Sequence, residues 1–251
     1  MAQLFAGTSG WAYPSWRPDF YPEKLAQKKF LSYYATRLNT VEVNFTFRQL
    51  VKETTIQNWM QESPVDFKFG IKAHQVITHI KRLKGTQDFV PRFLQTIEPL
   101  AAAGKLGPVL FQLPPNLKAD PPLLKDFLGT VPRTVPLAFE FRHDSWFSDA
   151  TWDVLRSCNA ALCVAETETM TTPDVVTAPF VYYRFRKPAY TGEEKRSMID
   201  RVRQHLAQRR DVFAYFKHEE TAAGALYAVD LLNDVGTAPS VVQPSEARRG
   251  R

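Results

Sequence analysis

The chain has 251 residues, of which 44% are hydrophobic and 13% aromatic, so it can bury a large core arranged as two small domains or one barrel. Its two cysteines, Cys158 and Cys163, are too few for a disulfide framework, and their spacing matches no metal finger. No apolar stretch approaches about 18 residues and the first residues lack a signal-peptide pattern. We therefore expect no membrane span, reduced thiols and a cytoplasmic location.

The formal net charge is +6, and part of this excess lies in the basic segment 245–251. A basic balance of this kind is compatible with an anionic ligand or with nucleic acid, but no nucleic-acid recognition motif accompanies it. No linker rich in Gly, Ser or Pro interrupts the chain before its end. We therefore expect one domain over residues 1–236 and a flexible tail over 237–251.

Eight apolar segments with the composition of strands occur along the chain. They cover residues 3–11, 40–47, 66–73, 108–115, 136–143, 160–166, 180–186 and 211–218. Helix-like segments lie between or after them, over residues 23–38, 52–62, 86–103, 121–128, 148–158, 193–209 and 221–234. The connection around 168–176 reads as a loop.

Strands that alternate with helices predict a parallel sheet joined by crossover helices. Eight such units in a chain of this length match the α/β architecture of a single-domain (β/α)8 TIM barrel. An open doubly wound sheet would more often carry a glycine-rich phosphate turn, and the GTSG sequence at 7–10 has neither the GxGxxG nor the P-loop spacing. We therefore predict a barrel.

The segment 136–146 (PLAFEFRHDSW) carries charge inside an apolar strand. Because alternate side chains of a strand point to opposite faces, Glu140 and Arg142 share one face while Phe139 and Phe141 share the other. Burial of an unpaired charge is very costly, so the polar face must meet partners, water or a ligand. This strand therefore predicts a functional site.

The same alternation can be applied to the other strands, because the outer face of each strand must pack on apolar helices. The residues expected to face the helices are Val41, Val43, Phe45, Phe67, Phe69 and Ile71. The residues expected to face the lumen are Glu42, Asn44, Thr46, Lys68, Gly70, Lys72, Gln112, Glu140, Arg142 and Arg184. In the eighth strand, Tyr215 and Lys217 share a face.

Barrel enzymes carry their sites at the carboxyl ends of the strands, and the polar residues of this chain occur late in the strands. The candidate catalytic residues are Glu42, Lys72, Glu140 and His143. The candidate ligand-binding residues are Trp11, Asn44, His79, Gln112, Arg142, Trp146, Arg184, Tyr215 and Lys217. Cations outnumber carboxylates in this set, so we expect Arg142 and Arg184 to grip an anionic group and Lys72 to act as a point charge or base.

Several alternatives stay open for these residues. The charges could form a structural ion-pair network that fills the barrel. His79 and His143 with Glu42 or Glu140 would supply two histidines and a carboxylate to a metal, but no paired-ligand spacing supports this, so we predict no metal ligand and leave the cofactor unknown. The aromatic first loop, including Trp11 and Trp16, could stack on a sugar or a base, or cover the barrel end.

The motifs GTSGWAYPSW, TVEVNFTF, FKFGIKA, ITHIKRL, LGPVLFQLPP and FEFRHDSW, in this order, resemble the DUF72 family, also called YecE-like. The resemblance covers Gly7 to Leu232 and implies a TIM barrel; it implies no activity, because the family is one of unknown function. The matching positions are Gly7, Ser9, Gly10, Trp11, Tyr13, Trp16, Glu42, Asn44, Thr46, Phe47, Lys72, Thr78, His79, Gln112, Pro114, Glu140, Arg142, His143 and Trp146. The last two strand ends, RFRKP and YFKHEET, depart from the family pattern.

These observations predict an uncharacterised barrel protein, more readily an enzyme than a binding protein, with its reaction class open. We expect a hydrolase, lyase or isomerase that acts on a small anionic or sugar-like ligand. The alternative is a non-catalytic protein that binds a ligand or nucleic acid through a basic, aromatic-rich barrel mouth. We expect no membrane partner, and the oligomeric state is not indicated.

Overall fold

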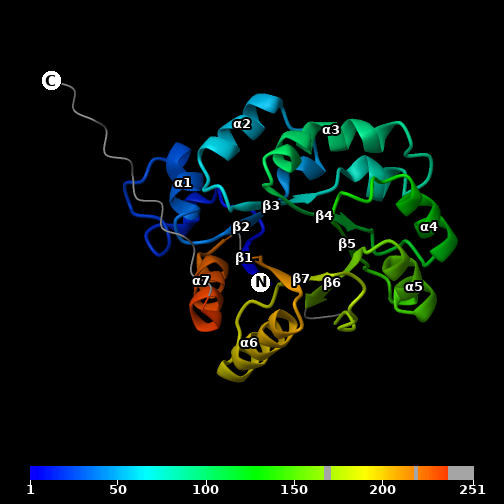
Figure 1. The fold of residues 1–251 in the computed structure, drawn as a ribbon. Coiled ribbons are helices and arrows are strands. Elements are labelled where there is room, and N and C mark those ends of the chain that lie inside the picture. Colours follow the sequence, from blue (N-terminus) through cyan, green and yellow to red (C-terminus); the bar gives the residue numbers. More distant parts are fainter. Residues whose placement is uncertain (167–170, 218–219, 237–251) are drawn as a thin grey trace.

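The computed structural model describes residues 1–166, 171–217 and 220–236. Eight parallel strands form one sheet that curls around a central axis (Figure 1). The strands are β1 (Leu4–Thr8), β2 (Thr40–Val43), β3 (Lys68–Lys72), β4 (Leu106–Gln112), β5 (Leu137–Glu140), β6 (Ala161–Glu166), β7 (Phe180–Phe185) and β8 (Asp211–Phe216). The expected tail 237–251 and His218 lie outside the described residues.

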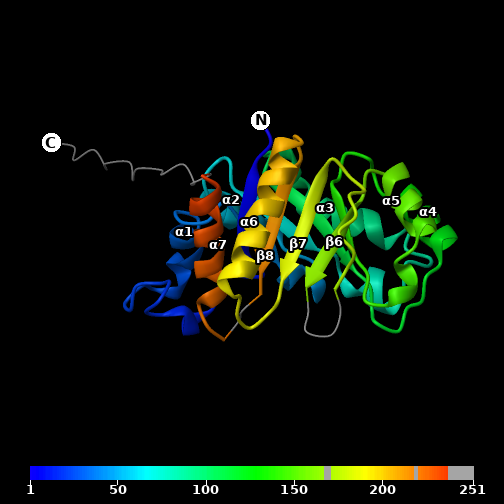
Figure 2. The same cartoon turned by 90° about the horizontal axis from the view of Figure 1, so that it is seen from below.

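Seven helices follow the strands and form the outer layer seen along the barrel axis in Figure 1 and from the side in Figure 2. They are α1 (Phe30–Tyr34), α2 (Glu53–Gln61), α3 (Phe89–Ala102), α4 (Pro121–Gly129), α5 (Asp149–Ser157), α6 (Gly192–Ala207) and α7 (Ala223–Val235). Within the described ranges, no helix is long and apolar enough to cross a membrane. The arrangement confirms the predicted (β/α)8 TIM barrel.

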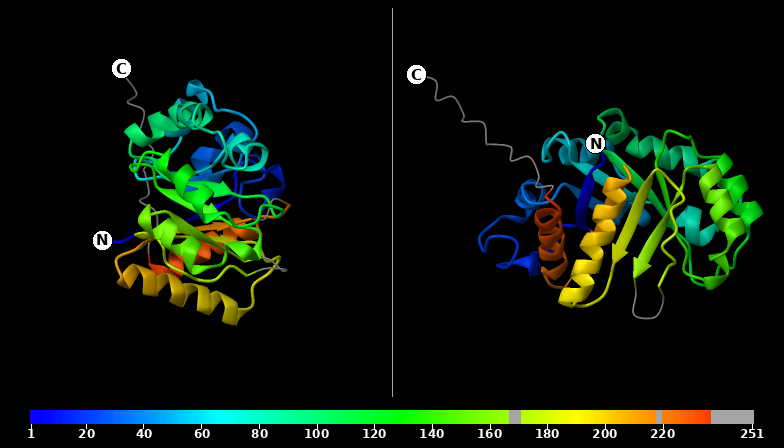
Figure 3. Two further views of the ribbon diagram at one scale, coloured as in Figure 1. Left: turned by 90° about the vertical axis from the view of Figure 1, so that its right-hand side faces the viewer. Right: turned by 60° about the horizontal axis from the view of Figure 1, so that its bottom comes forward.

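Two connections depart from the regular barrel pattern. The helix expected over residues 23–38 is reduced to a 3-10 turn (Gln27–Lys29) and α1, because residues 22–25 close a separate turn through the Leu25 amide and the Pro22 carbonyl. Between β6 and β7, the described residues 171–179 contain no helix, in line with the predicted loop. Strands β6 and β7 are therefore seen without a covering helix between α5 and α6 in Figure 3.

The barrel is nearly closed, and side chains complete its seam between β1 and β2. The side-chain oxygen of Asn39, Oδ1, accepts a hydrogen bond from the backbone N–H of Ala6 (3.0 Å). Its side-chain nitrogen, Nδ2, donates one to the backbone carbonyl of Leu4 (2.8 Å). The Tyr34 hydroxyl accepts from the Thr8 amide (2.8 Å) and donates to the Thr40 carbonyl (3.0 Å). These bonds satisfy backbone groups that a regular strand pair would satisfy directly.

We expect Tyr34→Phe to lower the free energy of unfolding by about 1–3 kcal/mol, because it leaves the buried Thr8 amide and Thr40 carbonyl without that partner. Urea unfolding measures the difference. Tyr33→Phe is the matched control, since Tyr33 lies one position earlier on the same helix and is only partly buried. Equal losses in the two variants would contradict the role of Tyr34 in the seam.

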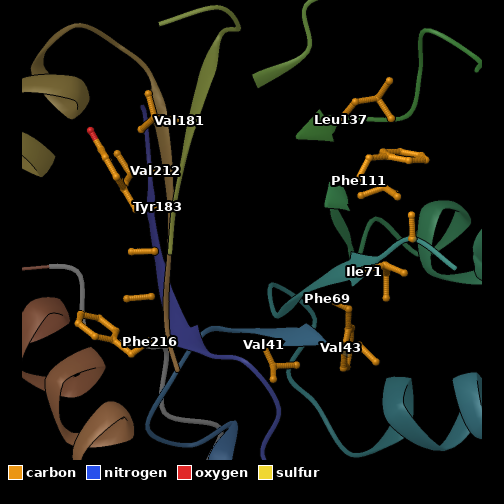
Figure 4. Packing of buried hydrophobic residues seen from close by; sticks show 14 of the residues in the cluster. Val41, Val43, Phe69, Ile71, Phe111, Leu137, Val181, Tyr183, Val212 and Phe216 are labelled. Atoms are coloured by element: carbon orange, nitrogen blue, oxygen red, sulfur yellow. The ribbon is translucent and has the colours of Figure 1, made fainter. Parts of the chain in front are cut away.

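The strand faces follow the predicted alternation. Val41, Val43, Phe69 and Ile71 are buried on the outer side of the strands, where they point toward the helices (Figure 4). Phe45 is an exception to the prediction: β2 ends at Val43, and Phe45 lies in a short 3-10 helix, η3 (Phe45–Phe47), with 49% of its surface exposed.

The lumen is packed with apolar side chains in its lower and middle part. A separate buried cluster inside the barrel includes Phe5, Leu110, Ala138, Ala161, Cys163, Ala165, Phe180, Tyr182, Phe213 and Tyr215. Polar lumen side chains occur above this cluster, at the carboxyl ends of the strands. Among the described residues, the polar side chains of the lumen are therefore concentrated at the end where barrel enzymes carry their sites.

Candidate functional site

Three charged side chains meet at the carboxyl end of the lumen: Glu42 at the end of β2, Glu140 at the end of β5 and Arg184 near the end of β7. They are 0%, 1% and 2% exposed, respectively. The Arg184 guanidinium lies between the two carboxylates, donating to Glu42 Oε1 (2.7 Å) and to Glu140 Oε2. Burial alone would lower the pKa of Arg184, but Glu42 and Glu140 outweigh it and hold that pKa above its usual value.

The other hydrogen-bonding positions of Glu42 are also occupied. Its Oε1 accepts a second hydrogen bond from Ser9 Oγ (2.8 Å), and its Oε2 accepts one from Tyr182 Oη (2.6 Å). Burial, and then the Glu42 charge, raise the pKa of Tyr182 well above its ordinary value, so this phenol stays a donor. Glu42 is thus held as an acceptor on both oxygens.

Glu140 is held in the same way. Gln112 Nε2 donates to its Oε1 (2.9 Å), and Arg186 Nη2 donates to its Oε2 (3.3 Å) beside the Arg184 contact. Two buried carboxylates with every oxygen engaged are poorly placed to exchange protons with a ligand. This geometry argues against the expected acid/base roles of Glu42 and Glu140 and against a glycosidase-like pair. It favours a role in holding the neighbouring cations in place.

Lys72, the last residue of β3, has no direct carboxylate partner among the described residues, unlike Arg184 and Arg186. Its Nζ donates to Gln112 Oε1 (2.9 Å) and lies 4.2 Å from the centre of the Phe47 ring. Burial, and then the Arg184 charge, lower the pKa of Lys72 from 10.5 to about 8. The Lys72 amine therefore titrates near neutral pH.

Gln112 sets this environment because it stands between Lys72 and Glu140. Its amide nitrogen faces the Glu140 carboxylate, so its amide oxygen faces the Lys72 ammonium. The neutral Gln112 side chain therefore links Glu140 to Lys72 by two hydrogen bonds, and no carboxylate contacts the amine directly. Arg184, Glu140, Gln112 and Lys72 thus form one hydrogen-bonded series across the end of the lumen.

Further cations lie beside Lys72 on the loops that follow β3 and β5. Burial lowers the pKa of His79, and the charges of Lys72, Arg142 and Arg82 lower it further, which places all three near the imidazole. Arg142 is exposed, whereas Arg82 and His79 are partly buried. Arg82 has a left-handed backbone (φ 48°), and its guanidinium donates to Asn116 Oδ1 (3.1 Å). The barrel mouth is therefore positive around Lys72.

A mainly apolar hollow of about 360 Å³ lies between the first loop, η3 and α2. Its lining residues include Trp11, Tyr13, Asn44, Phe45 and Trp59. The short helix η3 separates it from Lys72, since Phe45 lines the hollow while Phe47 contacts the Lys72 amine. The Asn44 Oδ1 atom is buried without a hydrogen-bond partner among the described residues. This oxygen is enclosed by the protein, so the contribution of Asn44 to the hollow is made by the rest of its side chain and its backbone.

The structure places two of the expected site residues away from the mouth. Trp146 is fully buried, stacks on Phe141 (4.6 Å between ring centres) and donates its indole N–H to the Leu117 carbonyl (2.8 Å). Tyr215 faces the lumen as expected but lies in the deeper layer, where its hydroxyl is 2.9 Å from Thr40 Oγ1. Neither side chain is positioned to contact a ligand at the strand ends, and both are part of the core.

The remaining expected residues lie at the rim. His143 is partly buried, and its Nδ1 accepts from the Ser145 amide (3.2 Å), so it is engaged within its own loop. Lys217 is exposed, directly after β8. Glu166, at the end of β6, accepts a hydrogen bond from Arg201 Nη2 on the outer helix α6 (2.7 Å).

The aromatic first loop is largely structural. Trp16 and Tyr21 are fully buried and stack on one another, whereas Trp11 and Tyr13 are partly exposed and line the hollow. Residues 1–166, 171–217 and 220–236 contain no group of three His, Cys, Asp or Glu side chains that could hold a metal ion. The proposed set of His79, His143 and a carboxylate is thus not assembled here.

Our candidate catalytic and ligand-binding residues did not include Ser9, Tyr182 or Phe47, which belong to the site. Strand alternation would have found Tyr182, because it shares the lumen face of Arg184 two residues later. Ser9 and Phe47 lie within the family motifs, but no feature of the sequence alone indicates that Ser9 binds a carboxylate or that Phe47 faces an ammonium group.

Comparison with known sequences places the chain among proteins of unknown function. The family model described as "Protein of unknown function DUF72" matches residues 5–250. The UPF0759 protein YunF of Bacillus subtilis is 28% identical over 151 residues, which cover 58% of this chain and 52% of the relative. The UPF0759 protein YecE of Escherichia coli is 30% identical over 146 residues, covering 58% and 50%. The chain spans about half the length of these curated relatives.

Solved structures of the same family have the same fold. A DUF72 family protein from Thermotoga maritima superposes with a TM-score of 0.80 at 25% identity, covering 93% of this chain and 99% of that one. A DUF72 family protein from Enterococcus faecalis gives a TM-score of 0.80 at 16% identity, covering 98% and 100%. These matches agree with the barrel described above.

Proposed function

Because this chain belongs to the DUF72 family, whose description gives no activity, we propose its function from the site itself. The protein binds a small anionic ligand, such as a phosphorylated or carboxylated sugar-like metabolite, at the carboxyl end of the barrel. It acts on this ligand as a hydrolase, lyase or isomerase, with Lys72 as the group that exchanges a proton. Glu42 and Glu140 hold the cations in position.

The excess of cations around Lys72 carries this proposal. Glu42 and Glu140 are already matched by the guanidinium groups of Arg184 and Arg186. Lys72 and Arg142 are left without a carboxylate partner among the described residues, and both influence the same imidazole, His79. A partly buried cluster of unmatched positive charge is stabilised by an anion, and an arginine offers two parallel donors to a phosphate or carboxylate.

The hollow beside η3 suits the uncharged part of such a ligand. Trp11 and Phe45 supply aromatic surface of the kind that stacks on the apolar face of a sugar ring. Asn44 adds a polar residue to this otherwise mainly apolar lining. A ligand that spans η3 would therefore place its anionic group near Lys72 and its hydroxyl-bearing part near Asn44.

We expect a sugar phosphate such as glucose 6-phosphate to raise the thermal unfolding temperature, whereas glucose at the same concentration has a much smaller effect. Arg142→Ala should abolish most of this shift, because it removes an unmatched cation at the mouth. Lys125→Ala is the matched control: it also removes one exposed positive charge, but from the outer helix α4. Thermal-shift measurements at fixed ionic strength, on the wild type and both variants with each sugar, give these comparisons.

Two outcomes would contradict the proposal. One is a wild-type protein whose unfolding temperature does not respond to sugar phosphates, sulfate or pyrophosphate. The other is a thermal shift that Arg142→Ala and Lys125→Ala reduce equally. Equal reductions would mean that the anion acts by general screening of the net positive charge and does not bind at a specific site.

A further inference from the structure

We propose that Lys72 is a nucleophilic amine that condenses with the carbonyl carbon of an anionic oxo compound, a phosphorylated or carboxylated aldehyde or ketone. This inference rests on the proposed anion site and deepens it, because it names the functional group of the ligand and the bond that forms. Lysine amines attack carbonyl carbons when they are held uncharged near other cations or in an apolar setting.

The surroundings of Lys72 Nζ fit this role. The amine has one neutral hydrogen-bond acceptor, Gln112 Oε1 at 2.9 Å, and an aromatic face, Phe47 at 4.2 Å, and no ion pair with a described carboxylate. Its side chain is partly buried at the end of β3, at the mouth of the barrel. The amine is therefore held in a fixed position that a bound ligand can reach.

Lys105 is a lysine of this barrel with a structural role, and its hydrogen bonding differs from that of Lys72. Its side chain is 6% exposed, and its Nζ donates to the Ser63 carbonyl (3.0 Å), to Ser63 Oγ (2.9 Å) and to the Pro64 carbonyl. Three oxygen acceptors stabilise an ammonium group and occupy all its protons. The Lys72 amine has one such acceptor, so it keeps the freedom to react.

The charges that face Lys72 support an uncharged amine. Burial and the Arg184 guanidinium lower its pKa to about 8, Lys217 lowers it further, and Glu42 and Glu140 act in the opposite direction without compensating. An appreciable fraction of the amine is then neutral at pH 7.5, whereas an ordinary lysine is almost entirely protonated. Arg142 nearby would hold the anionic group of the incoming ligand.

The step balances without a redox partner. The neutral Lys72 nitrogen gives its lone pair to the carbonyl carbon, and the electron pair of the C=O double bond moves to oxygen, which takes up a proton as the nitrogen loses one. The hydroxyl group so formed takes up a second proton from solvent, and the nitrogen lone pair forms the C=N double bond and expels it as water. The resulting protonated imine returns one proton to solvent, which leaves the neutral imine. One water leaves, and the product is an imine that becomes a cation on protonation.

Borohydride reduction traps such an imine as a stable secondary amine, so the test uses pyridoxal 5′-phosphate as the anionic aldehyde, borohydride and peptide mass mapping. We expect the label to concentrate on Lys72 and to fall strongly when pyridoxal without phosphate replaces the probe. Lys72→Arg, which keeps the positive charge, should lose this label. Lys125→Arg, on the exposed outer helix, should keep it.

A label spread over surface lysines with no preference for Lys72 would overturn the inference. The anion site itself is judged separately, from the thermal shift of the wild-type protein with glucose 6-phosphate. A retained shift in a wild-type protein that gives no Lys72 label means that the site binds anions but forms no imine. Absence of both the shift and the label in the wild-type protein contradicts both proposals.

Discussion

Replacement of Arg184 by methionine is expected to lower the free energy of unfolding by about 3–5 kcal/mol. The substitution keeps much of the side-chain volume but leaves Glu42 and Glu140, which are 0% and 1% exposed, buried without the guanidinium that joins them. An uncompensated buried charge is strongly destabilising because it loses its hydration and gains no opposite charge as a partner. Urea unfolding at pH 7 measures the loss.

Two variants isolate the cause of this effect. The triple change Glu42→Gln, Glu140→Gln and Arg184→Met removes the charges together, so it should recover a large part of the lost stability. Arg156→Met breaks an exposed ion pair with Asp153 and should change the stability by less than about 1 kcal/mol. A loss for Arg184→Met no larger than that of Arg156→Met would show that the buried network does not support the fold.

The second large effect concerns the pH dependence of anion binding. Sulfate keeps one charge state between pH 6 and 10, so a change in its affinity in this range reports on the protein. We expect the apparent Kd to be nearly constant below pH 7 and to rise above pH 8 by up to about tenfold per pH unit, as Lys72 loses its proton. Isothermal titration calorimetry at several pH values measures this curve.

Lys72→Met should bind sulfate more weakly at pH 7 and show no such rise near pH 8. Gln112→Glu would place a carboxylate on the Lys72 amine in place of the amide oxygen, so it should raise the pKa of Lys72 and move the midpoint to higher pH. A midpoint that is the same in the wild type and Lys72→Met would assign the titration to another group.

The same titration has a consequence for stability, with a definite sign. Because the pKa of Lys72 is about 8 in the folded chain and 10.5 when unperturbed, the unfolded state binds more protons between these pH values. Stability therefore rises with pH across this window, relative to Lys72→Met. Below pH 8 Lys72 is charged in the folded state, and the loss of stability caused by burying this charge is fully present. A bound anion would offset that loss.

Strand alternation was sufficient to predict which side chains face the lumen, since a period of two residues follows from backbone geometry alone. Glu42, Glu140 and Arg184 were found in this way. An ion-pair network among the lumen charges was one of the alternatives left open, but the individual pairs were not predicted, because the height of each residue in a barrel depends on the stagger between strands that lie far apart in the sequence. Tyr215 illustrates this: its face is as predicted, but it lies one layer too deep to reach a ligand.

Local turns account for most of the other differences. Trp146 follows polar residues directly in the sequence, yet the short 3-10 helix Asp144–Trp146 turns its ring into the core beside Phe141. The seam between β1 and β2 depends on Tyr34 and Asn39, two side chains outside the strands that they join. Neither contact has a periodic signature, so neither could be read from the sequence.

The most direct test of an anion site at Lys72 is a crystal structure of the protein with selenate, whose anomalous scattering locates the anion without ambiguity. We predict a selenate ion within hydrogen-bonding distance of Lys72 Nζ and Arg142 at the carboxyl end of the barrel. Selenate found only at surface lysines and arginines, with the space beside Lys72 unoccupied, would contradict the central claim.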